Sequence, residues 1–161
     1  MFEQIPQPMR NILVNNMEQE FYTRASYLIF SEDTTYLKAK DKSNFMIFSP
    51  KISSRVNLPC KFKFHLSMGL ISPKEELNGL EIRIYDPYND ILDVIEVGKL
   101  ILEQTDLPDD TVFSGNFSIH TDEGIDLNTE GFVRAELLFN ETVLSEATTL
   151  VREEGGQEDE H

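Results

Sequence analysis

Hydrophobic and polar residues alternate most regularly over residues 62–70. Phe62, Phe64 and Leu66 are separated by the polar Lys63 and His65, and the pattern continues to position 70. A period of two places alternate side chains on opposite faces of a β-strand, so one face is buried and the other is exposed. The same pattern predicts strands over residues 80–85 and 132–139.

Weaker patterns extend this interpretation to most of the chain. Aromatic and β-branched residues predict strands over residues 21–30, 35–40, 45–48, 112–120 and 142–151. Two apolar runs, 91–97 and 99–104, are interpreted as strands, with one helix over 91–104 as the alternative. Short strands joined by Gly, Pro, Asn and Asp loops predict an all-β fold, an antiparallel two-sheet immunoglobulin-like sandwich of about seven to nine strands. A closed barrel is the alternative architecture.

The chain is expected to form one domain with two appendages. Its 161 residues suit a single core. Residues 1–20 lack a sustained period and predict an extended N-terminal arm, followed by the sandwich over 21–151. Residues 152–161 are rich in Gly, Glu and Asp and predict a disordered acidic C-terminal tail.

Charge is distributed unevenly along the chain. The net charge is −15, which divides into +2 for residues 1–80 and −17 for residues 81–161. Phosphate binding depends on Lys and Arg, so direct binding to nucleic acid or to an anionic membrane is disfavoured. We find no apolar run of membrane-spanning length and no signal segment, and Cys60 has no disulfide partner within the chain, so we expect a cytoplasmic location.

A basic segment contrasts with this acidity. Its seven cations are opposed within residues 38–63 by Asp41 alone, and they are Lys38, Lys40, Lys42, Lys51, Arg55, Lys61 and Lys63. Such residues can simply keep strand edges soluble. They can also form an anion-binding or partner-binding site, and acidic and basic surfaces on one chain would allow it to pair head to tail with another copy.

No residue pattern indicates catalysis or a cofactor. Phosphate-binding loops and common hydrolase motifs are absent from the sequence. Cys60 and His65 are an odd number of positions apart, which directs them to opposite faces of an extended strand. We therefore expect no catalytic residue, no cofactor and no metal site. Two weaker metal hypotheses are a transition-metal pair, His65 with His120, and calcium at the acidic loops formed by Asp106, Asp109, Asp110, Asp122, Asp126, Asn128 and Glu130.

Because the sequence has no catalytic or cofactor-binding pattern, it favours a non-enzymatic module that binds a protein partner. Aromatic or apolar residues expected on an exposed face or turn are candidates for the interaction surface, namely Tyr85, Tyr88, Phe132 and Leu138. Two alternatives stay open. One is an acidic inhibitor that mimics the charge of nucleic acid, and the other is a small-molecule-binding β-barrel.

Three segments together resemble a small bacterial immunoglobulin-like domain of unknown function. They are the alternating strand 62–70, the strand and Asp-Pro turn 80–87, and the Gly-containing loop, strand and tight turn over 130–141. The resemblance covers roughly residues 22–151 and implies a sandwich fold without a mechanism. The sequence departs from antibody-like domains because it has neither paired cysteines nor a Trp.

Overall fold

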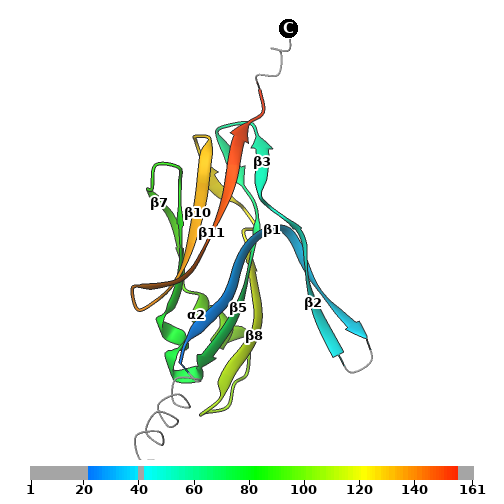
Figure 1. Cartoon of the computed structure of the whole chain (residues 1–161), viewed down its shortest axis with the longest axis vertical. Helices are drawn as coiled ribbons and strands as arrows, with labels where there is room; N and C mark the ends of the chain where they lie inside the picture. The colour runs from blue at the N-terminus through cyan, green and yellow to red at the C-terminus, as the bar shows by residue number, and fades with distance from the viewer. Residues whose placement is uncertain (1–21, 40–41, 156–161) are drawn as a thin grey trace, which may run out of the picture.

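Two β-sheets pack face to face in the computed structural model, which describes residues 22–39 and 42–155 (Figure 1). The first sheet has the order β2-β1-β5-β8, formed by Lys42–Pro50, Arg24–Ala39, His65–Pro73 and Val112–His120. The second has the order β3-β11-β10-β6-β7, formed by Ser53–Val56, Thr142–Glu153, Gly131–Phe139, Leu80–Tyr85 and Ile91–Ile95. A short ribbon pairs β4, Cys60–Phe62, with β9, Ile125–Leu127.

This arrangement confirms the all-β sandwich. Both main sheets are open, with edge strands β2 and β8 in one and β3 and β7 in the other, so the barrel alternative is wrong. The neighbours β1-β5-β8 and β6-β10-β11 match the A-B-E and C-F-G groupings of the immunoglobulin topology. The ladders are antiparallel except that β3 runs parallel to the last strand, β11.

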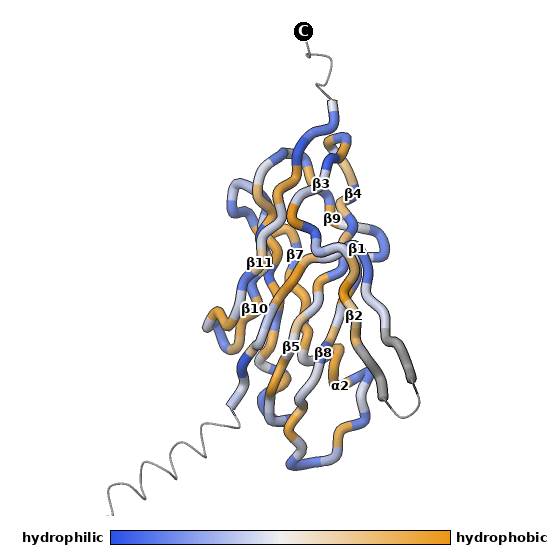
Figure 2. The backbone as a smooth tube through the Cα atoms, turned by 45° about the vertical axis from the view of Figure 1, so that its right-hand side comes forward, coloured by the Kyte–Doolittle hydropathy of each residue, from blue (hydrophilic) through white to orange (hydrophobic). Residues whose placement is uncertain are grey.

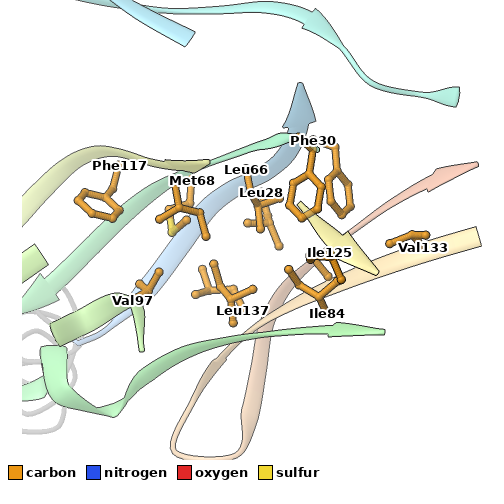
Figure 3. Packing of buried hydrophobic residues seen from close by; sticks show 14 of the residues in the cluster. Leu28, Phe30, Leu66, Met68, Ile84, Val97, Phe117, Ile125, Val133 and Leu137 are labelled. Atoms are coloured by element: carbon orange, nitrogen blue, oxygen red, sulfur yellow. The ribbon is translucent and has the colours of Figure 1, made fainter. Parts of the chain in front are cut away.

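The core lies between the two sheets and explains the alternation in the sequence. Leu66 and Met68 of β5 are fully buried and face Leu137 of β10 across the sandwich (Figure 3). Phe30 and Phe64 meet edge to face, with ring centroids 5.0 Å apart. Burial of one such side chain is worth about 1.5–3 kcal/mol, so the alternating positions supply much of the driving force for folding.

Two predicted elements differ in the structure. The strand over 62–70 is interrupted, because β4 ends at Phe62 and β5 begins at His65. The strand expected over 99–104 is wrong, since Val97–Gln104 forms the helix α2. Val97 and Ile101 lie one helical turn apart and are both fully buried, so an amphipathic helix fits this run better than a strand. A 3₁₀-helix, η2, occupies Lys74–Gly79 in the expected turn region.

Strand β1 is longer than predicted. It is one continuous strand where the sequence indicated two separated by polar residues, because its first half pairs with β5 and its second half pairs with β2. The register runs without interruption from Asp33 opposite Phe48 to Ala39 opposite Lys42. The β1–β2 hairpin therefore extends away from the sandwich (Figure 1).

The ends of the chain bear on the predicted domain limits. Strand β11 continues to Glu153, two residues beyond the expected end of the sandwich at 151. The predicted N-terminal arm and most of the predicted tail lie outside the described residues. Within residues 22–39 and 42–155, we find no helix with the length and apolar character needed to cross a lipid bilayer.

Candidate functional site

Four residues of the predicted basic segment line one hollow on the surface. This depression of about 390 Å³, which we call the basic hollow, lies between edge strand β3 and strand β4. Lys51 precedes β3, Arg55 belongs to β3, and Lys61 and Lys63 lie on and just after β4. Figure 2 shows that β3, β4 and β9 lie at the same end of the sandwich.

The remaining basic residues lie elsewhere. Lys38 and Lys42 are near the far end of the β1–β2 hairpin, where Lys42 is paired with Ala39. Lys40 lies outside the described residues. Folding therefore divides the basic segment into a hairpin group and a group at the basic hollow, which proximity in sequence does not reveal.

The cations of the basic hollow differ in how they are partnered. Lys61 forms an ion pair with Asp126 of β9 at 2.7 Å, and this hydrogen bond raises the pKa of the lysine. The ammonium of Lys51 lies 5.5 Å from the centroid of the Phe62 ring, in a cation–π contact. Among the described residues, neither Arg55 nor Lys63 forms an ion pair, and both are exposed. These two charges are therefore available to an anionic ligand.

Arg152 is a further cation at this edge that the sequence analysis missed. The parallel pairing of β3 and β11 places Arg152 opposite Arg55, and both side chains are exposed. The residue was assigned to a disordered acidic tail, so no pattern in the sequence connected it with the basic segment. One carboxylate, Glu32, also lines the basic hollow. The lining of the basic hollow nevertheless has four cations against this one carboxylate, on a chain of net charge −15.

The predicted aromatic surface is only partly present. Phe132 and Tyr88 are 63% and 72% exposed. Tyr85 is half-buried, with the guanidinium of Arg134 lying 4.3 Å from its ring centroid. The prediction that Leu138 is exposed is wrong, since it is 2% exposed. The β10–β11 register shifts between Leu137 and Leu138, so simple alternation between the two faces fails at this position.

Arginines neutralise much of the acidity on the outer face of the five-stranded sheet. Arg83 contacts Glu81 and Glu141, and Arg134 contacts Glu136 and Glu146. The hydrogen bonds of Arg83 raise the pKa of this arginine further above its ordinary value, and the bond to Glu141 has the largest effect. Carboxylates held in such pairs are poor mimics of the free phosphates of a nucleic acid. This face therefore gives no support to the charge-mimic alternative.

The histidines meet, as the metal hypothesis required. His65 and His120 are direct cross-strand partners in β5 and β8, and their rings stack with centroids 5.3 Å apart. The Asp33 carboxylate lies 3.7 Å from Nε2 of His65, and the Asp122 carboxylate lies 2.7 Å from Nε2 of His120. Within the part of the chain that the structure describes, no group of three or more His, Cys, Asp or Glu side chains has metal-binding geometry. That finding applies to the calcium hypothesis as well.

Cys60 is separated from the histidine pair. It lies opposite Leu127 in the β4–β9 ribbon and lines the basic hollow, whereas His65 contacts Thr34, Asp33 and His120. Burial raises the pKa of the Cys60 thiol above its ordinary value. A catalytic thiol needs the opposite shift, toward the thiolate. The environment of Cys60 is therefore that of an unactivated thiol.

Comparison with known proteins assigns no role to this site. No family model matches the chain, and no curated protein matches it. The structure is similar to that of an immunoglobulin-like protein from Pseudomonas aeruginosa, with a TM-score of 0.40 and 12% sequence identity over 81% of this chain and 96% of that chain. The likeness is one of fold.

Proposed function

We propose that this protein is a non-enzymatic interaction module that binds an acidic segment of a partner protein at the basic hollow. The observation that carries the proposal is the gathering of Lys51, Arg55, Lys61 and Lys63 around one depression on an otherwise acidic chain. Complementary charge steers association and suppresses wrong partners, so a local basic surface on an acidic domain favours partners that are themselves acidic.

Apolar residues beside the basic hollow supply the second requirement of a binding surface. Ile52, which immediately precedes β3, is 80% exposed. Phe132 pairs with Leu150, and Leu150 in turn pairs with Ser53, so Phe132 and the β3 edge belong to one transverse row of the sheet. An exposed aromatic beside unpaired cations resembles the combination of apolar anchor and charged rim found at protein interfaces.

A peptide-binding measurement tests the proposal. Fluorescein-labelled hexaglutamate should bind the full chain in a fluorescence-anisotropy titration, and binding should weaken as added salt screens the charges. Reversing three charges at once, Lys51→Glu with Arg55→Glu and Lys63→Glu, should weaken binding at least about tenfold, a loss of about 1.4 kcal/mol.

The control uses a cation away from the basic hollow. Lys99 is exposed on α2, so Lys99→Glu makes the same kind of charge reversal there and should leave peptide binding nearly unchanged. Equal losses in both proteins would indicate nonspecific charge attraction and overturn the proposal. Tighter binding of a labelled DNA duplex than of hexaglutamate would also overturn it, because the net charge of −15 opposes nucleic acid.

A further inference from the structure

The five-stranded sheet has a basic edge and an acidic edge. Its strand order places β3 at one edge and β7 at the other, and the two strands lie on opposite sides of the sandwich (Figure 1). Asp93 lies within β7, with Asp90 and Glu96 just outside its two ends, and all three side chains are exposed. Between residues 84 and 98 the sequence contains no Lys or Arg. The two edges therefore carry opposite charges.

Strand β7 has the features of a segment that can dock. Among the described strands it pairs with β6 alone, so its other side is an edge of the sheet. Ile91 and Val94 are 55% and 46% exposed. A hollow of about 360 Å³ beside this strand is lined by three carboxylates, those of Asp93, Asp122 and Glu123.

Strand β3 is suited to receive such a segment. The Leu150 amide donates to the Ile52 carbonyl, and the Glu154 amide donates to the Val56 carbonyl. Because peptide groups alternate in direction along a strand, those of Ser53 and Arg55 point away from β11, toward the free edge of the sheet. No other described strand pairs with β3 on that side, so an extended segment that approaches this edge meets backbone groups free of strand partners, together with the cations of the basic hollow.

We propose that the acidic segment bound at the basic hollow is strand β7 of a second copy of this chain, which adds to strand β3. The inference rests on the proposed function and names its partner. Asp93 of one copy faces Arg55 of the other, and main-chain hydrogen bonds join the two sheets as in β-strand addition. The exposed Val94 and Ile52 lie at the same junction and add apolar contact.

The symmetry of this contact follows from its two different edges. It joins β3 of one copy to β7 of the next, so it is a heterologous, head-to-tail interface. A pair of copies keeps one free edge of each sign, so the assembly grows into a ring or an open chain. The net charge of −15 opposes crowding of copies. Association should therefore be weak, concentration-dependent and sensitive to salt.

Sedimentation velocity of the full chain over a range of concentrations tests the inference. The wild-type protein should form dimers and larger species that dissociate at high salt. Arg55→Glu and Asp93→Lys should each be monomeric, because each removes one edge. A mixture of the two should associate again, since the acidic edge of the first protein still fits the basic edge of the second and the two reversed residues attract each other. A chain carrying both reversals should regain association.

Glu103→Lys is the control matched to Asp93→Lys. It makes the same charge change at an exposed position on α2 and should leave association unchanged. Circular dichroism verifies that each variant is folded. A wild type that stays monomeric, or a mixture that forms no heterodimer, overturns the inference. Hexaglutamate binding distinguishes the two failures. If Asp93→Lys still binds the peptide while the wild type does not self-associate, the proposed function stands and the second copy is the wrong partner.

Discussion

Arg55 and Arg152 are direct neighbours in the parallel pairing of β3 and β11, although they are almost one hundred positions apart in the sequence. We therefore expect Arg152 to contribute to the basic edge. Arg152→Glu should weaken hexaglutamate binding about two- to fivefold, as befits an exposed charge interaction worth up to about 1 kcal/mol. Anisotropy titrations beside Lys99→Glu measure the effect. Unchanged affinity in Arg152→Glu would show that the site ends at β3.

At Gly98 in α2, helix propensity favours Ala but tertiary packing favours Gly. A Cβ atom at this position would lie 1.6 Å from the carbonyl oxygen of Leu77. Helix propensity favours Ala over Gly by about 1 kcal/mol, but overpacking costs about 1–3 kcal/mol, so Gly98→Ala should lower stability. Gly115→Ala is the control, because its Cβ would meet only the Phe113 ring at an ordinary 3.7 Å. Urea denaturation compares the two, and a stabilised Gly98→Ala protein would contradict the close approach.

Alternation predicts that Leu138 and Phe132 lie on the same exposed face, but only Phe132 does. Leu138 is 2% exposed and Phe132 is 63% exposed. Leu138→Ala should lower the free energy of unfolding by about 2–5 kcal/mol, whereas Phe132→Ala should change it by about 0.5 kcal/mol or less. Urea denaturation midpoints with unchanged slopes check this contrast. Similar losses in both variants would contradict the burial of Leu138.

Tyr85 should titrate above the ordinary range of tyrosine. A hydrogen bond with Glu136, together with burial, raises its pKa, and this outweighs the opposing contact with Arg83. Glu136→Gln removes the negative acceptor that favours the protonated phenol, so the pKa of Tyr85 should fall toward its ordinary value. Phenolate absorbance over an alkaline titration, with Tyr85→Phe identifying the signal, measures the change. A pKa that rises or stays constant in Glu136→Gln would exclude this cause.

Cys60 should react slowly with alkylating reagents. Burial raises its pKa from 9.0, so the nucleophilic thiolate forms at higher pH in the folded protein than in the unfolded chain. The pH at half-maximal rate of iodoacetamide labelling should therefore lie higher in buffer than in urea. Mass spectrometry follows the reaction in both conditions. An equal or lower midpoint in the folded protein would indicate that the neighbouring lysines control the thiol instead.

The sequence by itself determined the fold class and much of the core. Period-two alternation identifies positions such as Leu66, Met68 and Ile84, because a strand with one buried face allows few other arrangements, and all three are fully buried. The sequence did not distinguish the helix α2 from a strand, because a short apolar run is compatible with both and tertiary packing decides between them. Leu138 shows that alternation fails where the register shifts.

Only the tertiary structure decided which charges act together. Lys38 and Arg55 belong to one basic segment in the sequence, but Lys38 lies in the β1–β2 hairpin, far from β3. Arg152 of β11 lies beside Arg55 instead. Likewise, the opposite edges of the five-stranded sheet acquire opposite charges through a strand order that joins residues distant in sequence. Each strand must bury its apolar side chains, so the alternation in its own sequence shows which positions face the core. Surface charge meets no such requirement, so only the long-range pairing of strands can assemble the basic hollow.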